Sequence, residues 1–289
     1  MIMREFIKMH GLGNDFVIVD ARESPLVVSA AGTRYLSDRR TGIGFDQLIA
    51  LDAPTKPNAE DNADVDVRIF NADGSEVTAC GNAMRCVAHL LLNKNASDAR
   101  LRIRTGAGLL EAWRDTETPI NYAVDMGPAR DTWQDIPLAR NCDTGHLPLT
   151  LGPLSDPVGV NIGNPHAVFF VDDITAIPIE TLGPALECDP LFPERANIGI
   201  AQLTGDNQLQ LRVWERGTGL TLACGSGACA AAVAAHRRDL TGRNVQVDVD
   251  GGTLNIEWRV DNHVVMSGPA EESFRGAVGE TAFLAATNG

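Results

Sequence analysis

The strongest constraint on this chain is an internal repeat. Residues 71–86 (NADGSEVTACGNAMRC) and 215–229 (ERGTGLTLACGSGAC) each carry Ala-Cys-Gly followed by a small polar residue. Each stretch then runs into an apolar segment with helical spacing. The two cysteines, Cys80 and Cys224, lie 144 residues apart in a chain of 289. Any fold for this sequence must therefore place one such cysteine in each half.

Three further landmarks recur in the same order at nearly the same offset. The pairs are Gly13-Asn14 with Gly163-Asn164 at 150 positions, Trp113 with Trp258 at 145, and Gly127-Pro128 with Gly268-Pro269 at 141. Four ordered matches indicate a duplicated domain, and two copies are too few for a solenoid. We predict two similar domains, residues 1–126 and 127–270, with the tail 271–289 returning to the first.

Apolar patterning predicts the same elements in both halves. Short runs of alternating apolar residues predict strands, and an apolar stripe over residues 81–93 predicts a helix that begins just after Cys80. An Ala-rich segment at 228–238 predicts its counterpart, and residues 30–40 predict a further helix. The expected fold is therefore α+β: two pseudo-symmetric domains, each a mostly antiparallel sheet or barrel around a central helix.

Composition narrows the classes of partner. The net charge of −14 argues against nucleic-acid binding, which depends on clustered Lys and Arg. No apolar run is long enough for a signal peptide or a membrane span, so we expect no membrane association and a cytoplasmic location. The six cysteines fit neither a disulfide framework nor paired zinc-binding motifs, which favours reduced thiols and no metal site.

The matched cysteines suit one type of chemistry. A cysteine at the first turn of a helix has its thiolate favoured by the helix dipole, which predicts a pKa lowered towards neutral pH. If the halves face each other, both thiols reach one cleft from opposite sides. One can then remove a proton from a carbon while the other delivers a proton to the opposite face, as racemisation requires. The alternative is that both cysteines are small buried residues, as most cysteines are; matched motifs favour the chemical interpretation.

The α-hydrogen of an amino acid is a weak acid, and many enzymes that remove it use pyridoxal phosphate bound to a lysine. The chain has three lysines, Lys8, Lys56 and Lys94, and none lies in a Gly-rich context for a phosphate. We therefore expect no cofactor. The substitute would be the backbone N–H groups at the two helix starts, Gly81-Asn82 and Gly225-Ser226, which can bind a carboxylate as it gains charge.

Six motifs together carry a family resemblance. They are GLGNDF, TGIGFDQ, NADGSEVTACGN, GNPHAV, ERANI and ERGTGLTLACGSGAC, in this order across nearly the whole chain. The set resembles the diaminopimelate epimerase family, whereas the two cysteine motifs alone indicate only the wider group of cofactor-independent epimerases and racemases. Ala83-Met84 departs from the small residues expected after Cys-Gly-Asn, which affects helix packing rather than the proton path.

The resemblance implies an isomerase that interconverts LL- and meso-diaminopimelate in lysine and peptidoglycan precursor biosynthesis, with its active site in the cleft between the domains. It implies that Cys80 and Cys224 are the acid–base pair and that His166 and Glu215 bias their protonation. It also implies that four residues at the helix starts hold the α-carboxylate and amine at the reacting centre: Gly81, Asn82, Gly225 and Ser226. The other substrate-binding residues would act mostly at the distal amino-acid end of the substrate: Asn14, Gln47, Asn71, Asn164, Asn197, Glu215 and Arg216. By the same analogy Phe274 would belong to a homodimer contact.

Two alternatives remain at this point. A proline or hydroxyproline racemase of the same architecture would need no charged side chain such as Arg216 to bind a distal end of its substrate. A thiol redox or metal-binding protein would use Cys80 and Cys224 as a disulfide or as ligands. Cys86, Cys142, Cys188 and Cys229 are expected to be structural, and the segments 52–64 and 131–157 carry no functional signal.

Overall fold

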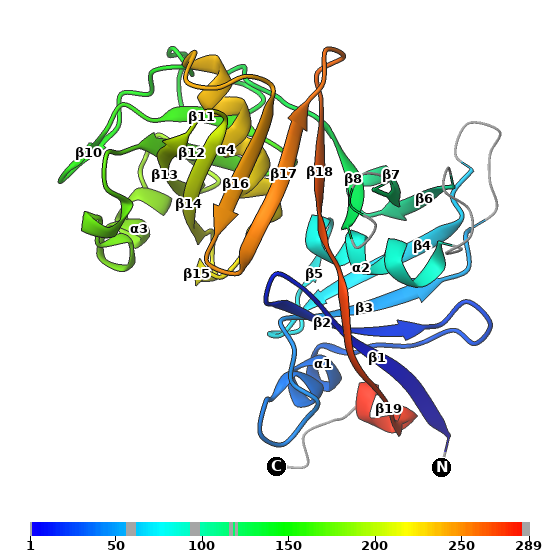
Figure 1. Ribbon diagram of the computed structural model, residues 1–289. Helices are drawn as coiled ribbons and strands as arrows, with labels where there is room; N and C mark the ends of the chain where they lie inside the picture. The colour runs from blue at the N-terminus through cyan, green and yellow to red at the C-terminus, as the bar shows by residue number, and fades with distance from the viewer. Residues whose placement is uncertain (1, 56–61, 93–98, 116–117, 119–120, 285–289) are drawn as a thin grey trace. The chain divides into compact units, whose positions relative to one another are not determined.

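The computed structural model describes residues 2–55, 62–92, 99–115, 118 and 121–284 (Figure 1). Parts of the predicted loop 52–64, the last residue of the predicted helix 81–93 and the end of the tail 271–289 lie outside these residues. The chain folds as two compact units, Met1–Val124 with Pro269–Gly289, and Asp125–Gly268. The segment that begins at Pro269 therefore belongs with the first unit.

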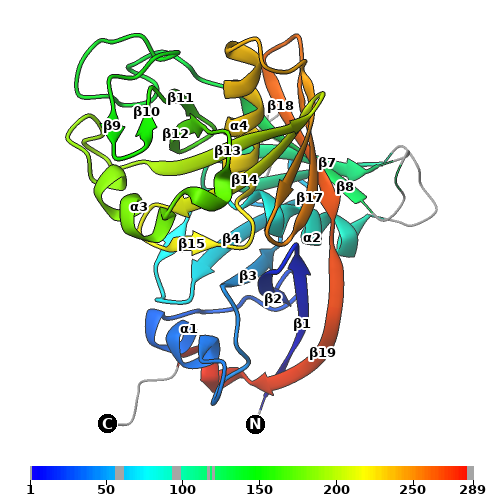
Figure 2. The ribbon, with the colours of Figure 1, turned by 60° about the vertical axis from the view of Figure 1, so that its left-hand side comes forward.

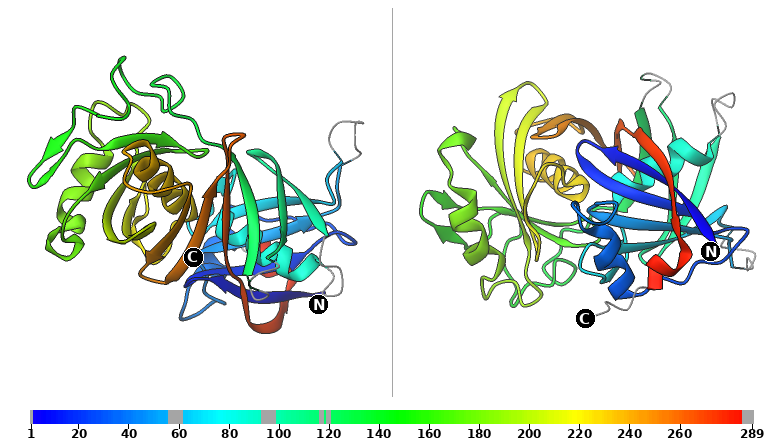
Figure 3. Two further views of the ribbon diagram at one scale, coloured as in Figure 1. Left: turned by 45° about the horizontal axis from the view of Figure 1, so that its top comes forward. Right: turned by 90° about the horizontal axis from the view of Figure 1, so that it is seen from below.

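Unit 1 is built on a mixed sheet that includes the last strand of the chain. Its strands are β1 (Met3–Gly11), β2 (Asn14–Asp20), β3 (Gln47–Asp52), β4 (Val65–Asn71), β5 (Glu76–Val77), β6 (Arg100–Thr105), β7 (Gly108–Arg114) and β19 (Glu271–Gly279). β19 pairs with β1 and β1 with β2, so the first and last strands of the sequence lie side by side in this unit (Figure 3). The order continues through β3 and β4 to β6 and β7.

Unit 2 repeats this plan. Its strands are β11 (Val158–Asn161), β12 (Pro165–Phe170), β13 (Asn197–Gly205), β14 (Gln208–Glu215), β15 (Gly219–Thr221), β16 (Asn244–Val249), β17 (Gly252–Trp258) and β18 (His263–Pro269). A small hairpin, β9 (Thr150–Leu151) with β10 (Leu154–Ser155), lies in the segment 131–157, where no functional signal is expected. Residues of that segment, including Ile136 and Leu147, belong to the buried core of the unit.

The order of strand directions is the same in both units. β1–β2 and β11–β12 are antiparallel, whereas β2–β3 and β12–β13 are parallel. The next pairs, β3–β4 and β13–β14, are antiparallel, and β4–β6 and β14–β16 are parallel. This repetition confirms the predicted α+β class and the predicted duplication.

Each unit holds one buried helix. α4 (Gly225–Arg237) contacts β11, β12, β13, β14, β16 and β17 and buries ten residues, mostly alanines (Figure 2). α2 (Gly81–Leu91) occupies the same position in unit 1, against β1, β6 and β7. α2 begins at Gly81 as predicted. α4 begins three residues earlier than predicted, because the Gly-Ser-Gly that reads as a turn in the sequence forms its first turn.

Two further helices lie outside the central ones. α1 (Ala30–Ser37), predicted over residues 30–40, ends at Ser37, before Asp38 and the turn that follows. α3 (Ile179–Glu187) is not predicted, because its Gly183 and Pro184 are unfavourable inside a helix. Burial of Ile179 and Leu186 in the core of unit 2 outweighs that preference. Short 3₁₀ turns are present at η1 (Ile174–Ala176) and η2 (Glu280–Leu284).

The chain passes from one unit to the other twice, each time at a strand. β8 (Asn121–Pro128) begins in unit 1 and ends in unit 2, and β18 ends at Pro269, the first residue of the second segment of unit 1. After β8, Arg130 forms an antiparallel bridge with Asn161 at the end of β11. After β18, the chain pairs with β1 in the same way. Among the described residues, no helix is both long enough and apolar enough to cross a membrane.

The C-terminal turn docks on α1 through backbone contacts. Ser29 caps the helix by accepting from Gly32 N, and Ser29 N donates to Phe283 O at 2.9 Å. Phe283 is fully buried in the unit 1 core. A Cβ atom at Gly32 would lie 2.0 Å from Phe283 O, which no real contact allows. Gly32 is thus required for this close approach.

We therefore expect Gly32→Ala to lower the free energy of unfolding by about 3 kcal/mol or more, because the clash is with backbone and cannot be relieved by a side-chain rotation. Urea unfolding followed by circular dichroism measures the loss. The matched control is Gly199→Ala, where the new Cβ would make only ordinary contacts of 3.5 Å or longer. Equal stability of the two variants would contradict this explanation.

Candidate active site

Cys80 lies directly before the first residue of α2. Its backbone is extended (φ −153°, ψ 103°), and its side chain makes no capping hydrogen bond with the helix. Cys80 Sγ lies 3.9 Å from Asn14 Oδ1, and Asn82 Nδ2 donates to the same oxygen at 3.2 Å. The structure thus brings together three predicted site residues, Cys80, Asn14 and Asn82, with Gly81 between two of them.

Two more predicted residues of unit 1 form a pair beside this group. Gln47 faces Asn71 across β3 and β4, and Gln47 Nε2 donates to Asn71 Oδ1 at 2.9 Å. Asn71 Nδ2 in turn donates to Ser75 Oγ at 3.2 Å. Asp46, the neighbour of Gln47, accepts from Asn14 Nδ2 at 2.9 Å. One hydrogen bond therefore connects Asn14 with the segment that carries Gln47.

Cys224 has the equivalent place at the start of α4. Its backbone is also extended (φ −116°, ψ 106°), again with no side-chain cap. Cys224 is buried, and its Sγ lies 3.7 Å from Ser226 Oγ. Gly225 and Ser226 form the first turn of the helix. The predicted residues Cys224, Gly225 and Ser226 therefore repeat the arrangement of Cys80, Gly81 and Asn82.

A row of polar side chains crosses the sheet of unit 2 beside the start of α4. His166 faces Asn197 across β12 and β13, and Glu215 ends β14 one residue beyond the partner of Ile198. His166 Nε2 lies 2.9 Å from Asn164 Oδ1, 3.1 Å from Ser226 Oγ and 3.4 Å from Asn197 Nδ2. The imidazole thus connects both predicted amides with the helix start.

The same row exists in unit 1 with different residues. Phe16 faces Gln47, and Gln47 faces Asn71. The phenyl ring of Phe16 thus corresponds to the imidazole of His166, and Asn71 corresponds to Glu215. The duplication therefore places two similar sets of side chains at two helix starts, and their chemistry differs at specific positions.

Glu215 and Arg216 lie on the turn after β14, and neighbours fix both. Thr221 Oγ1 donates to Glu215 Oε1 at 2.5 Å. Arg216 N donates to Asn197 Oδ1 at 2.8 Å, and Arg216 Nη1 donates to Glu194 O at 2.9 Å. The backbone of Arg216 is therefore tied to the row that contains His166.

Burial changes the expected ionisation of Cys224. Desolvation raises the pKa of its thiol well above the ordinary value, and the charge of Glu215 raises it further. Hydrogen bonds from Ser226 and from Gly227 N oppose this increase but do not outweigh it. The predicted lowering of the thiol pKa is thus wrong for Cys224, because desolvation exceeds the effect of the helix N-terminus.

His166 is also fully buried, and it is neutral at physiological pH. Desolvation, with a smaller contribution from the charge of Arg216, lowers the pKa of the imidazole to about 3. A neutral imidazole carries a proton on one nitrogen only, so it can donate one hydrogen bond and accept another. Nε2 can therefore donate to Asn164 Oδ1 in one tautomer and accept from the Ser226 hydroxyl in the other, without a gain of charge.

Several residues that hold the site are not among the predicted ones. Asp46 and Asp15 both pair with Arg39, and Lys8 also pairs with Asp15. Burial opposes ionisation of Asp15, yet hydrogen bonds from Arg39 and Lys8 hold the pKa of this carboxyl well below its usual range. Both aspartates are within the motifs GLGNDF and TGIGFDQ, so their place in the motifs is the available signal.

In unit 2 the residue that sequence reasoning misses is Glu187, at the end of α3. Its carboxylate is buried and accepts from Trp214 Nε1 at 2.8 Å and from Gly217 N at 3.0 Å. Glu187 therefore fixes the turn that carries Glu215 and Arg216. No sequence signal points to it, because it belongs to the helix that is not predicted.

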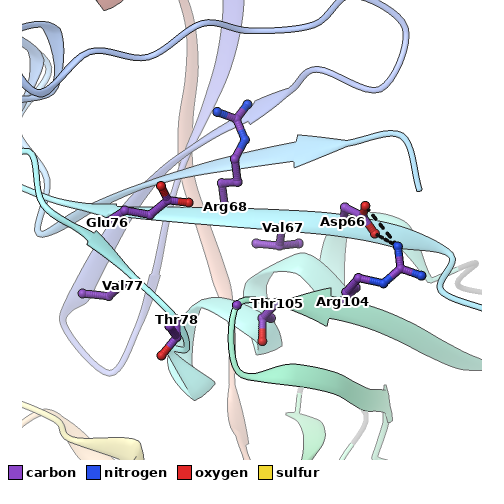
Figure 4. Close-up of a pocket in the computed structure, with 9 residues that line it drawn as sticks. Asp66, Val67, Arg68, Glu76, Val77, Thr78, Arg104 and Thr105 are labelled. Carbon is purple, nitrogen blue, oxygen red and sulfur yellow. Dashed lines mark hydrogen bonds and ion pairs between the residues drawn. The ribbon is translucent and has the colours of Figure 1, made fainter. Parts of the chain in front are cut away.

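An open hollow of about 280 Å³ in unit 1 contains none of the predicted site residues (Figure 4). Two ion pairs involve its charged residues: Arg104 binds Asp66, and Arg68 binds the adjacent Asp52. All six cysteines are free thiols. In the part of the chain that the structure describes, no three His, Cys, Asp or Glu side chains are grouped to hold a metal ion.

Known protein sequences align with nearly the whole chain. The family model for diaminopimelate epimerase matches residues 6–132 and 158–272. The diaminopimelate epimerase of Acidiphilium cryptum is 52% identical over 282 residues, which are 98% of each chain. That of Erythrobacter litoralis is 55% identical over 272 residues, 94% of this chain and 96% of the relative.

Solved structures of low identity share the fold. A PhzF-family phenazine biosynthesis protein of Bacillus anthracis has a TM-score of 0.66 at 15% identity, covering 96% of this chain and 99% of its own. A hydroxyproline epimerase of Agrobacterium vitis has a TM-score of 0.66 at 13% identity, covering 96% and 92%. The match of the family model and relatives above 50% identity together show that this chain belongs to the diaminopimelate epimerase family.

Proposed function

We propose that this protein interconverts LL- and meso-diaminopimelate by moving a proton at the α-carbon between Cys80 and Cys224, without an organic cofactor. The observation that carries the proposal is the matched position of the two cysteines, each directly before a buried helix in one of two similar units. We further propose that the two sets of side chains face one cleft in the working enzyme. Membership of the diaminopimelate epimerase family supports the choice of substrate.

The proposed reaction needs one base and one acid. A thiolate removes the α-hydrogen from one face of the carbon, and the carbanion takes a proton from the other thiol on the opposite face. The first cysteine ends as a thiol and the second as a thiolate, so no proton or electron is lost or gained. The reverse reaction exchanges the roles.

The carbanion requires stabilisation of the negative charge that spreads onto the α-carboxylate. The first turns of α2 and α4 begin with Gly81-Asn82 and Gly225-Ser226, and helix starts present backbone N–H groups to anions. We propose that these N–H groups bind the α-carboxylate. Glycine directly after each cysteine lets the backbone approach a ligand closely.

The remaining polar residues would bind the distal amino-acid group of the substrate. Arg216 can bind a carboxylate with two parallel hydrogen bonds, and amide oxygens can accept from an ammonium. We propose this role for Asn14, Gln47, Asn71, Asn164, Asn197, Glu215 and Arg216. Most of these side chains hydrogen-bond one another or nearby groups, so substrate would replace some of those contacts.

Glu215 and His166 would set the protonation state of Cys224. The carboxylate of Glu215 raises the pKa of Cys224, so it favours the thiol and can accept its proton when the thiolate is needed. His166 remains neutral and contacts Ser226 beside the thiol. This assignment explains why two units of one fold carry different groups at equivalent positions.

The direct test replaces each thiol. Cys80→Ala and Cys224→Ala should each lower epimerisation by roughly 10²- to 10⁴-fold or more, because each removes an acid or base from the reaction. In deuterated water the wild-type enzyme should place deuterium at the α-carbon of the product. Chiral chromatography and mass spectrometry of diaminopimelate measure both results.

Cys188→Ala is the matched control, since Cys188 is an exposed thiol at the end of α3 and should be replaceable without loss of activity. Full activity in either active-site variant, or product without solvent deuterium, would reject the two-thiol reaction.

The neutral state of His166 also predicts an acid sensitivity of the fold. The folded pKa of about 3 is below the ordinary value of 6.5, so between these values the unfolded chain binds a proton that the folded chain does not. The free energy of unfolding should therefore fall on acidification through this range, by at most about 1.4 kcal/mol per pH unit from this group. His166→Gln should lose less stability than wild type between about pH 6.5 and pH 4.

Thermal melting at several pH values measures this difference. Carboxyl groups whose pKa is lowered by ion pairs reduce stability only at the acid end of this range, and they do so equally in wild type and variant. His146→Gln is the control, because His146 is exposed in the same unit. If His166→Gln and wild type lose stability equally, the imidazole is not held neutral by burial.

We also propose that the enzyme acts in the cytoplasm as a homodimer. Six free thiols favour a reducing compartment. The β1–β19 pair and the residue before it expose apolar side chains, with Phe274 49%, Ile2 69% and Met3 50% exposed, which is unusual for a solvent-facing sheet edge. Phe274 also packs edge-to-face on Phe6, so its ring has a fixed position.

Sedimentation equilibrium tests the homodimer. Phe274→Glu should weaken self-association at least about tenfold, because it places a charge among buried apolar groups. Val260→Glu is the control, since Val260 is 95% exposed on the turn between β17 and β18. A monomeric wild-type protein at micromolar concentration would reject the homodimer. The proposed location is tested by cell fractionation, and recovery of the enzyme outside the cytoplasmic fraction would reject it.

A further inference from the structure

Four side chains of unit 1 form one continuous chain of hydrogen bonds. Arg85 Nη1 donates to Asn82 Oδ1 at 2.9 Å, and Asn82 Nδ2 donates to Asn14 Oδ1 at 3.2 Å. Asn14 Nδ2 then donates to Asp46 Oδ2 at 2.9 Å. The chain runs from a cation on α2 to an anion before β3, and it passes beside Cys80.

The two charged ends fix the direction of every bond. A guanidinium has only donors and an ionised carboxylate has only acceptors. Asn82 must therefore turn its oxygen to Arg85, and Asn14 must turn its NH₂ group to Asp46. It follows that Asn14 presents its oxygen, and not its NH₂ group, to Cys80 Sγ at 3.9 Å.

Both ends are held by further contacts. Arg85 is fully buried, and its Nε donates to Pro269 O at 3.3 Å. Asp46 accepts from Arg39 at 2.8 Å, and Arg39 also binds both carboxylate oxygens of Asp15. The end groups therefore cannot rotate without breaking several other bonds.

Unit 2 has no such charged ends at the equivalent described positions. At the duplication offsets, Cys229 stands where unit 1 has Arg85, and Ala196 stands where it has Asp46. Both are buried and uncharged. The directed chain is therefore a property of the Cys80 half of the molecule, and the contact between His166 and Ser226 takes its place beside Cys224.

We propose that Asp46 and Arg85 are positioning residues that act on Cys80 through Asn82 and Asn14. By holding the oxygen of Asn14 towards the sulfur, they favour the protonated thiol, which can donate to an oxygen, over the thiolate, which cannot. Cys80 is thereby kept as the acid of the pair until substrate binds. The catalytic meaning rests on the proposed function, whereas the effect on the thiol does not.

Other charges act on Cys80 directly and must be separated from this effect. Arg85 on the same helix carries a positive charge, whereas burial raises the pKa of the Cys86 thiol to about 12, so Cys86 is uncharged near neutral pH. Further charges lie beyond Asn14. They are Asp46 and Asp15, together with the cations that pair with them, Arg39 and Lys8. A negative charge at Asp46 would disfavour a thiolate even without Asn14, so the experiment needs a cycle of variants.

The test measures how fast iodoacetamide labels Cys80, read by mass spectrometry of its peptide between about pH 6 and pH 9, because only the thiolate reacts. Asp46→Asn removes the charged acceptor at one end of the chain, so only Asn82 still holds the oxygen of Asn14 in place, and the NH₂ group of Asn14 turns towards the sulfur in a larger share of the molecules. We expect labelling near neutral pH to become roughly threefold to tenfold faster, which corresponds to the net free energy of one ordinary hydrogen bond.

Asn14→Ala and the double variant Asn14→Ala with Asp46→Asn complete the cycle. If Asp46 acts through Asn14, the second substitution changes little once Asn14 is absent. Asp52→Asn is the matched control, since Asp52 carries the same charge on β3 and pairs with Arg68 instead; its labelling should equal that of wild type.

Two outcomes would overturn the proposal: unchanged labelling in Asp46→Asn, or the same increase with and without Asn14, which would mean a direct charge effect. Because labelling does not require turnover, this result is independent of the substrate assignment. If labelling responds as expected but diaminopimelate is not epimerised, the proposed function fails and the positioning role remains.

Discussion

The structure depends on burying a helix on almost every side. α4 can lie inside unit 2 because its side chains are mostly alanine, so surrounding strands approach its backbone closely. The first turn of such a helix leaves N–H groups without partners inside the helix, and Cys224 and Cys80 supply no side-chain cap. Each unit therefore presents donors beside a thiol, which is the combination that carbanion chemistry needs.

The two helix starts and the duplication can be predicted from the sequence, because they depend on local residue patterns. The repeated Ala-Cys-Gly motifs indicate both helix starts, and the recurring landmarks indicate two similar halves. Two results depend on surroundings that the sequence does not show. Desolvation of Cys224 outweighs the helix dipole, and packing of Ile179 and Leu186 stabilises α3 despite its glycine and proline. Asp46 and Glu187 escape prediction because they touch the predicted residues only after folding.

The two units share one backbone arrangement but carry different side chains around their cysteines. Unit 1 surrounds its cysteine with amides and charges, whereas unit 2 has a buried neutral imidazole and a carboxylate. The positions are equivalent in strand register, so the difference comes from side chains alone.

The path of the chain after each Gly-Pro-Ala has a separate consequence. β19 follows the last strand of unit 2 yet completes the sheet of unit 1, and the chain after β8 bridges to β11. A polypeptide that stopped near residue 126 would leave β1 with an uncovered edge. In an ancestor encoded by only one half, the edge of β1 would have been covered only by a strand from a second molecule. Gene fusion would then have turned this intermolecular strand pairing into an intramolecular one.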